Sequence, residues 1–282
     1  MDIVRDPQQF QQQALAARAR GQVTALVPTM GFLHEGHASL IRWAAANAGR
    51  VCVSVFVNPT QFGPGEDLDA YPRNPEGDAA LAEACGADVL FMPEPGALYA
   101  PDHCTWVEVP PLAQHLCGAS RPVHFRGVAT VVTMLLNLAQ PDVAVFGQKD
   151  WQQLALLRRM VRDLHLPCRI EGRPIVREAD GLALSSRNVY LGPAERAQAP
   201  GLHAGLLAAA ALARAGQRDA ATLKAAIAAH YAAHVPAGEV DYIEIVDPET
   251  VQPVATLAGA ALAAVAVRLG RARLIDNELL QP

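Results

Sequence analysis

Short apolar runs alternate with helical patterns over the first half of the chain. Buried strands are predicted where β-branched and other apolar residues cluster between turn residues, at residues 23–27, 51–57, 88–92 and 143–146. Amphipathic helices are predicted at residues 38–48, 75–86, 126–139 and 151–164. Strands that alternate with helices need crossover connections, so this half is expected to form an α/β domain around a mainly parallel sheet.

The pattern changes near residue 175. A polar stretch comes first, and alanine-rich helical segments follow at residues 193–213 and 219–234. Two further apolar runs predict strands at residues 240–246 and 261–269. We therefore expect two domains, an α/β domain over residues 1–175 and a smaller α+β domain over residues 176–282.

Composition narrows the class of protein. The chain has 282 residues, 51% of them hydrophobic, and a net charge of −5, which excludes disorder as its main state. The sequence pI of about 6.0 and the lack of a basic run argue against a nucleic-acid partner. No apolar stretch is long enough for a membrane span, and no secretory signal is recognisable. Five scattered cysteines predict neither a disulfide framework nor a zinc site, so a cytoplasmic protein is expected.

The first chemical motif lies between a predicted strand and a predicted helix. It reads Pro-Thr-Met-Gly-Phe-Leu-His-Glu-Gly-His over residues 28–37. A helix N-terminus presents free N–H groups and a partial positive charge, so it favours phosphate. His34 and His37 could bind phosphate oxygens or donate a proton to a leaving pyrophosphate. Two alternatives remain, namely solvated loop histidines and a zinc site, and the zinc site needs a third ligand.

Three other segments follow predicted strands or lie in the polar stretch. Lys149 ends the sequence Phe-Gly-Gln-Lys, and it is one of only two lysines in the chain. A lysine at a strand end can reach a phosphate, whereas Lys224 fits a solvated helix position. Ser185, Ser186 and Arg187 offer two hydroxyls and a guanidinium, which suit a triphosphate. Gln61 follows the second strand in Asn-Pro-Thr-Gln-Phe and could bind a small hydroxy acid.

Together these segments resemble the pantoate–β-alanine ligase family over nearly the whole chain. The resemblance rests on PTMGFLHEGH, FVNPTQF, HFRGVATVV, FGQKDWQQL, DGLALSSRN and the closing ARLIDN. It implies a Rossmann-like N-terminal domain, a smaller C-terminal domain that covers the site, and a homodimer. The implied reaction joins (R)-pantoate to β-alanine with ATP, through pantoyl adenylate, and releases AMP and pyrophosphate. ATP and Mg²⁺ are the implied substrate and metal.

The resemblance also implies residue roles. The implied ATP-binding residues are Met30, Gly31, Phe32, Leu33, His34, Glu35, Gly36, His37, Gly147, Gln148, Lys149, Asp150, Val176, Leu184, Ser185, Ser186 and Arg187. Those implied in catalysis are His37 as proton donor, His34, Lys149, Ser185, Ser186 and Arg187. Gln61 and Gln153 are implied to bind pantoate, with Gln61 also near β-alanine. Asp78 is the implied Mg²⁺ ligand, although Gly77 stands where many relatives have a second acid.

Other functions compete with this interpretation. A different small-molecule nucleotidyltransferase would share the histidine and serine–arginine motifs but would not need both Gln61 and Gln153. A non-catalytic nucleotide-binding regulator would not need paired histidines, a lysine and an arginine around one triphosphate. A metal-dependent hydrolase would use His34 and His37 as ligands.

Overall fold

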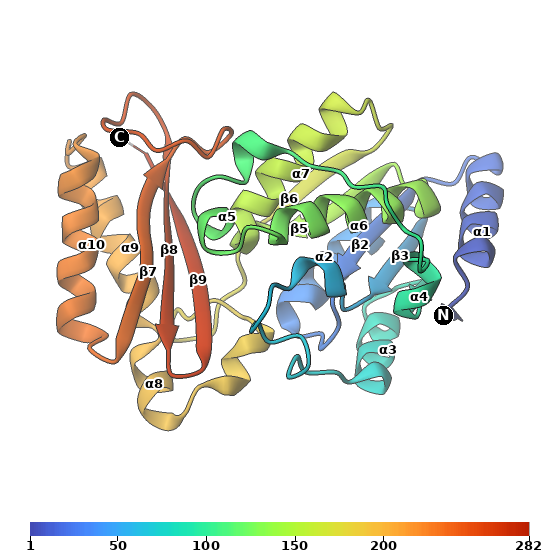
Figure 1. Ribbon diagram of the computed structural model, residues 1–282, viewed down its shortest axis with the longest axis horizontal. Helices are drawn as coiled ribbons and strands as arrows, with labels where there is room; N and C mark the ends of the chain where they lie inside the picture. Colours follow the sequence, from blue (N-terminus) through green and yellow to red (C-terminus); the bar gives the residue numbers. More distant parts are fainter. Residues whose placement is uncertain (282) are drawn as a thin grey trace. The chain divides into compact units, whose positions relative to one another are not determined.

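The apolar runs in the first half of the chain pair side by side in one parallel sheet (Figure 1). The computed structural model describes residues 1–281. The sheet has six strands in the order β1-β4-β3-β2-β5-β6. They are β1 (Asp2–Val4), β2 (Thr24–Thr29), β3 (Arg50–Val55), β4 (Val89–Phe91), β5 (Val143–Gly147) and β6 (Arg169–Arg173). Every pairing within it is parallel, so the predicted α/β class is confirmed.

The chain divides into two compact units that are not contiguous in sequence. Unit 1 contains Met1–Pro110, Arg121–Gln148 and Leu156–Pro174. Unit 2 contains Pro111–Ser120, Lys149–Ala155 and the chain from Ile175 onward. The segment around Lys149 therefore groups with the C-terminal part of the chain, although it follows a strand of the parallel sheet.

Helices cover both faces of the unit 1 sheet, as expected when crossover helices connect parallel strands. On one face, Ile41 of α2 packs with Val27 and Val53 of the central strands. On the other face, Phe10 of α1 stacks on Phe91 of β4 with ring centroids 4.2 Å apart. The helices are α1 (Pro7–Ala19), α2 (Glu35–Asn47), α3 (Pro75–Ala84), α4 (Pro95–Leu98), α6 (His124–Ala139) and α7 (Trp151–Asp163), with α7 passing into unit 2 at its N-terminal end.

Several elements of unit 1 have no counterpart among the sequence predictions, among them β1, α1, β6 and the four-residue helix α4. Strand β1 has only three residues, and α1 carries five glutamines, which weaken its apolar pattern. Strand β6 lies at the edge of the sheet. It contains three charged residues, and Ile170 is its one buried residue. An edge strand of this kind lacks the continuous apolar run that marks a buried strand.

Unit 2 is built on an antiparallel sheet of three strands in the order β7-β8-β9. These are β7 (Gly238–Val246), β8 (Ala261–Leu269) and β9 (Ala272–Leu280). The central strand β8 is buried at every position except Arg268. Helices α9 (Gly201–Arg214) and α10 (Ala220–His234) pack on the sheet through small and branched residues, including Leu206, Ile227 and Val265.

The predicted helical segment 193–213 is two helices in the structure. Helix α8 (Pro193–Gln198) ends shortly before α9 begins at Gly201, and Pro200 precedes α9. Proline has no N–H to extend the hydrogen-bond pattern of α8, which explains the break. Unit 2 also contains the short helices α5 (Cys117–Ser120) and η4 (Ser186–Tyr190), while the 3₁₀ segments η2 (Pro110–Leu112) and η3 (Gln148–Asp150) each begin with a residue of unit 1.

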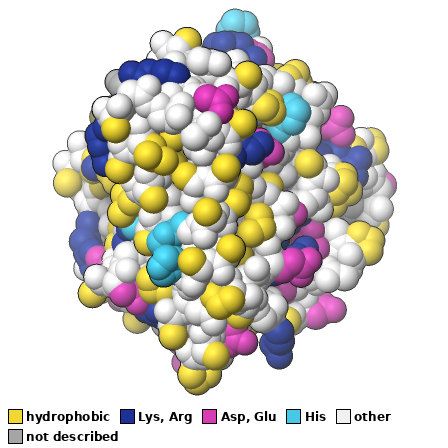
Figure 2. Space-filling model, turned by 90° about the vertical axis from the view of Figure 1, so that its left-hand side faces the viewer, with side chains coloured by type: hydrophobic (Ala, Val, Ile, Leu, Met, Phe, Trp, Pro, Cys, Tyr) yellow, Lys and Arg dark blue, Asp and Glu magenta, His cyan; other side chains and the backbone are white. Residues whose placement is uncertain are grey.

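The surface is mixed in character. Across the face shown in Figure 2, basic, acidic and apolar side chains are interspersed. Over residues 1–281, no helix combines the length and the apolar character that crossing a bilayer would take.

Candidate active site

The loop after β2 makes a tight turn before α2 begins at Glu35. Gly31 has a φ of +85° and Phe32 a φ of +52°, so two successive residues adopt the left-handed conformation. A Cβ on Gly31 would lie 2.9 Å from both the Oδ2 of Asp78 and the Cγ1 of Val55. Glycine is required here because the turn passes so close to its neighbours.

Asp78 of α3 holds this turn in place. Its carboxylate accepts the backbone N–H groups of Phe32 at 2.9 Å and of Leu33 at 2.6 Å. Burial raises the pKa of Asp78, while the two backbone hydrogen bonds lower it. The side chain is 2% exposed. Its task in the fold is therefore to bind backbone amides of the turn.

The magnesium prediction for Asp78 has to be weighed against this role. Within the described residues, no group of three or more histidines, cysteines or acids is placed to hold a metal ion. Mg²⁺ is commonly bound through one or two carboxylates together with substrate phosphates. Asp78 retains lone pairs for such a contact, so the metal role stays a prediction, with the substrate phosphates as the main ligands.

His34 and His37 form the N-terminal cap of α2. The Nδ1 of His34 accepts the backbone N–H of Gly36 at 3.1 Å, and the Nδ1 of His37 accepts the N–H of His34 at 3.3 Å. Their ring centroids lie 4.1 Å apart. Because Nδ1 accepts in both rings, each neutral imidazole carries its proton on Nε2. The helix N-terminus thus has two N–H donors beside it, an arrangement suited to phosphate oxygens.

Glu35 begins α2 between the two histidine positions. Its carboxylate pairs with Arg42 two turns further along the same face of α2, at 2.5 Å, and both side chains are more than half exposed. A solvent-exposed pair of this kind contributes little to stability. The predicted role of Glu35 in ATP binding stays a prediction.

Gln61 lies in η1 (Pro59–Gln61), directly after strand β3. Its Oε1 accepts from the Nδ2 of Asn58 at 3.1 Å, and its Nε2 contacts the Sδ of Met30 at 2.9 Å. Asn58 also donates to the carbonyl of Gly127 at 3.1 Å and accepts from the Thr60 hydroxyl at 3.0 Å. These contacts fix the Gln61 amide next to Met30, so two residues from separate predicted motifs meet here.

Asn58 and Gly127 contact the predicted site residue Gln61 or its neighbours, and the sequence analysis missed both. Asn58 is 1% exposed and orients Gln61 from within the same motif. A Cβ on Gly127 would lie 2.6 Å from the backbone of Thr60 and Gln61, so α6 can approach η1 only with glycine at this position. Both residues occur in segments that the resemblance had marked, yet only the spatial contact reveals their role.

The segment after β5 carries the predicted lysine. Gly147 ends β5, and the side chain of Gln148 contacts the carbonyl of Gly172 at the limit of hydrogen-bond distance, 3.5 Å. Lys149 belongs to unit 2, where its Nζ lies 3.9 Å from the Oδ1 of Asp150 and its carbonyl accepts from the Nδ2 of Asn277 at 2.9 Å. The lysine backbone is thus anchored, while its side chain is 20% exposed.

Two adjacent glutamines on α7 have different surroundings. Gln152 is buried and binds three backbone groups, the carbonyls of Leu112 and His115 and the N–H of Cys117. Gln153 is only partly buried. Gln152 therefore has a structural role, and the role of Gln153 in binding pantoate stays a prediction.

The polar stretch of unit 2 folds back on itself before the serine–arginine segment. The N–H of Leu184 donates to the carbonyl of Val176 at 3.0 Å, closing a hairpin-like turn. Ser185 then caps η4, since its Oγ accepts the N–H of Arg187 at 3.3 Å. Ser186 is 7% exposed. The predicted residues 184–187 therefore form one compact turn in unit 2.

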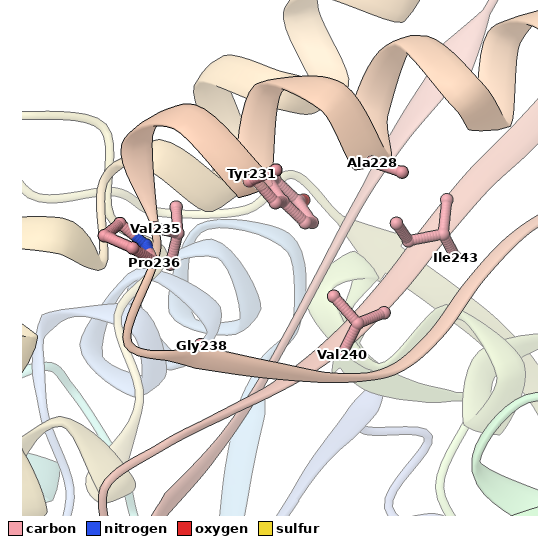
Figure 3. Close-up of a pocket in the computed structure, with 8 residues that line it drawn as sticks. Ala228, Tyr231, Val235, Pro236, Gly238, Val240 and Ile243 are labelled. Carbon is pink, nitrogen blue, oxygen red and sulfur yellow. The ribbon is translucent and has the colours of Figure 1, made fainter.

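A separate cavity of unit 2 lies apart from these residues. It has a volume of about 400 Å³, opens to the surface and is lined by residues of α10, β7 and the loop between them, with Tyr231, Val235, Val240 and Ile243 in its wall (Figure 3). The hydroxyl of Tyr231 donates to the carbonyl of Leu202 at 2.8 Å. A wall of apolar side chains offers nothing to a triphosphate.

The sheet and the loops at its carboxyl edge define the class of protein. Ligands of parallel sheets bind beyond the carboxyl ends of the strands, where the β2–α2 turn, η1 and the residues after β5 begin. The capped N-terminus of α2 supplies donors for an anion. The arrangement is that of an α/β protein that binds a phosphate-bearing ligand.

Comparison with known proteins identifies the family. The family described as pantoate-beta-alanine ligase matches residues 2–279. A pantothenate synthetase of Nitratidesulfovibrio vulgaris (strain DP4) is 60% identical over 280 residues, which cover 99% of each chain. A pantothenate synthetase of Desulfatibacillum aliphaticivorans is 48% identical over 282 residues and the full length of both chains. The chain therefore belongs to the pantoate–β-alanine ligase family.

Solved structures agree with this assignment. The crystal structure of pantothenate synthetase from Thermus thermophilus superimposes with a TM-score of 0.94 at 46% identity, covering 100% of both chains. The pantoate–β-alanine ligase of Francisella tularensis, complexed with β,γ-ATP and β-alanine, gives a TM-score of 0.81 at 32% identity over 99% of this chain and 97% of that one. Both the family and the fold expected from the sequence are confirmed.

Proposed function

We propose that this chain is an ATP-dependent ligase that joins (R)-pantoate to β-alanine, yielding pantothenate, AMP and pyrophosphate. The observation that carries the proposal is the cap of α2, in which the Nδ1 atoms of His34 and His37 both accept backbone N–H groups. This geometry puts the ring protons on Nε2 at a helix N-terminus, where negative charge is stabilised. Membership of the family supplies the substrates, and the Francisella tularensis relative is complexed with β,γ-ATP and β-alanine.

The first step is adenylation of pantoate. A carboxylate oxygen of pantoate attacks the α-phosphorus of ATP, and the bond from that phosphorus to the bridging oxygen breaks, releasing pyrophosphate. Most of the barrier is charge on the phosphates, so positioned donors and cations are the effective catalysts. We assign this task to His34, His37, Lys149 and Arg187, with His37 as proton donor and Ser185 and Ser186 as hydroxyl donors.

The second step is transfer of the pantoyl group. The neutral amine of β-alanine attacks the acyl carbon of the adenylate, the bond to the AMP oxygen breaks, and the ammonium proton is lost to solvent or base. This step needs mainly proximity. We assign pantoate binding to Gln61 and Gln153, because Gln61 is held by Asn58 and Gln153 is not committed to the backbone contacts that Gln152 makes.

The remaining ATP contacts are proposed at the ends of β2 and β5 and in the polar stretch of unit 2. We assign them to the segments 30–37, 147–150 and 184–187, and to the backbone of Val176. Mg²⁺ would neutralise phosphate charge beside Asp78 when bound. The proposal also includes a homodimer acting in the cytoplasm, with residues 1–175 as the catalytic domain and residues 176–282 as a lid.

Pyrophosphate release tests the proposal. Purified protein is incubated with ATP and Mg²⁺, then with pantoate added, and then with β-alanine added. We expect one burst of pyrophosphate with pantoate alone, because the adenylate stays bound, and continuous release once β-alanine is present.

Other outcomes identify the competing functions. Continuous release with a mononucleotide in place of pantoate would indicate another nucleotidyltransferase. ATP binding without pyrophosphate release under any condition would indicate a regulator. Activity that requires zinc would indicate a hydrolase.

A further inference from the structure

The closing motif Leu-Ile-Asp-Asn contains two buried polar residues on strand β9. Asp276 is 4% exposed and Asn277 is 6% exposed. Successive residues of a strand point to opposite faces of its sheet. Leu274 and Leu280, at the same parity as Asp276, belong to the hydrophobic core formed with α9 and α10, so Asn277 lies on the opposite face.

Asn277 reaches the phosphate-binding lysine. Its Nδ2 donates to the backbone carbonyl of Lys149 at 2.9 Å, across 128 positions of sequence. The bond is to the backbone and does not involve the Lys149 ammonium, which lies 3.9 Å from the Oδ1 of Asp150. Holding this carbonyl fixes the point from which the lysine side chain extends.

Asp276 reaches the segment that leads into the serine–arginine turn. Its carboxylate accepts hydrogen bonds from both terminal nitrogens of Arg177, at 2.7 Å and 2.9 Å. Arg177 donates in addition to the carbonyl of Gly181 at 3.1 Å and pairs with Ala183 through a β-bridge. A planar guanidinium bound at two oxygens has little freedom to turn, so the chain from Arg177 to Ala183 is held in one geometry.

The two anchors are coupled through the backbone of β9. The N–H of Asn277 donates to the Oδ1 of Asp276 at 2.8 Å, so the carboxylate that binds Arg177 also orients the residue that binds Lys149. Buried and fully bonded polar groups of this kind specify one arrangement, because breaking either bond leaves a partner unsatisfied.

We propose that Asp276 and Asn277 are positioning residues for adenylation. Asn277 acts through Lys149, and Asp276 acts through Arg177 on the turn that carries Ser185–Arg187. The inference rests on the proposed function, in which Lys149 and Arg187 bind the phosphates of ATP. A displacement of about 1 Å at such groups can cost on the order of a hundredfold in rate.

A double-mutant cycle tests the first half. Pantoate-dependent ATP–pyrophosphate exchange is measured for the wild type, Asn277→Ala, Lys149→Ala and the double variant. We expect Asn277→Ala to lower kcat/KM for ATP by about tenfold or more and to change the KM for pantoate by less than about twofold. In the Lys149→Ala background, the same substitution should lower kcat/KM for ATP by less than about twofold further, because Asn277 acts through Lys149. Equal losses in both backgrounds would overturn the role of Asn277.

Asn277→Asp and Tyr231→Phe separate positioning from folding. Asn277→Asp keeps the shape of the side chain but replaces the donor with an oxygen that faces the Lys149 carbonyl, so the loss of exchange should recur. Tyr231→Phe removes the buried hydrogen bond to Leu202 in the same unit and should lower the Tm without changing kcat/KM for ATP. If Asn277→Asp keeps wild-type exchange, or Tyr231→Phe loses as much exchange as Asn277→Ala, the inference is wrong.

A second double-mutant cycle tests the role of Asp276, with the variants Asp276→Asn, Arg187→Ala and the combination of both. Asparagine keeps the size of Asp276 but removes the charge that binds Arg177, and its effect should disappear in the Arg187→Ala background. Independent effects would overturn the role of Asp276. Near-normal exchange in Lys149→Ala and Arg187→Ala would instead contradict the proposed function, so the two failures are distinguishable.

Discussion

The carboxylate of Asp78 accepts the backbone N–H of Leu33 at 2.6 Å, and this bond connects α3 to the turn that precedes α2. The neighbouring N–H of Phe32 binds the same carboxylate at 2.9 Å. One acid therefore fixes the turn that precedes His34. Substitutions of Asp78 can show how much these two hydrogen bonds contribute to stability and activity.

Replacing Asp78 with alanine should destabilise unit 1 and slow adenylation. Two backbone N–H groups lose a charged acceptor, which should cost about 3 kcal/mol of the free energy of unfolding. Urea denaturation and pyrophosphate exchange measure the two effects. Asp69→Ala, at an exposed position, is the matched control and should change neither. If Asp78→Ala kept wild-type stability and only raised the Mg²⁺ concentration needed, metal binding would be its main role.

Two substitutions of His34 should separate its role as the N-cap of α2 from its proposed role in binding phosphate. Asparagine is among the preferred N-cap residues, so His34→Asn should keep the free energy of unfolding close to that of the wild type. His34→Ala loses the cap and should cost about 1 kcal/mol. Both variants lose the Nε2–H donor and should lower the exchange rate by about a hundredfold. Normal exchange in His34→Asn would show that the ring only caps the helix.

Gly127→Ala should disturb the pantoate site from the far side of η1. Alanine usually stabilises a helix by up to about 1 kcal/mol relative to glycine. Here its Cβ would meet the backbone of Thr60 and Gln61 at 2.6 Å, so overpacking should destabilise the protein by about 1–3 kcal/mol instead. Steady-state kinetics should show a raised KM for pantoate, because Gln61 moves.

Gly96→Ala is the control for that substitution. Gly96 has open space around its position in α4, so this variant should not lower stability and should leave the KM for pantoate unchanged. An unchanged KM for pantoate in Gly127→Ala would argue against Gln61 as a pantoate ligand.

The two lysines provide a comparison within one chain. Lys149→Ala should lower pantoate-dependent exchange by at least about a hundredfold, as expected when one donor to the transition state is removed. Lys224→Ala removes only the partly exposed pair with Glu244, at 2.9 Å, and should leave the exchange rate unchanged. Near-normal exchange in Lys149→Ala would contradict the assignment of this lysine to the phosphates.

The buried strands and their loops are predictable because local sequence determines them. β2 and α2 stand out as an apolar run and a helical pattern, so the turn between them can be placed from the sequence alone. The sequence predicts the start of α2 at residue 38, yet the helix begins at Glu35, because the cap is made by histidines in place of the usual serine or aspartate.

The partners of the site residues are not predictable, since they come from distant parts of the sequence. Nothing near Asp78 indicates that it binds the N–H of Leu33, and nothing near Asn277 indicates Lys149. β9 itself is not predicted as a strand, because its buried aspartate and asparagine interrupt the apolar pattern. Both polar residues are tolerated there only because each has a bonded partner.

Unit 2 is assembled from three separate segments of the sequence, and this has a consequence for folding during synthesis of the chain. Its segments Pro111–Ser120 and Lys149–Ala155 leave the ribosome long before β9, whereas Lys149 must wait for Asn277, 128 positions later, to receive its hydrogen bond. Domains generally fold as units, with N-terminal domains first. The hydrogen bond to the Lys149 carbonyl therefore forms only at the end of translation, so a nascent chain truncated before β9 lacks this anchor.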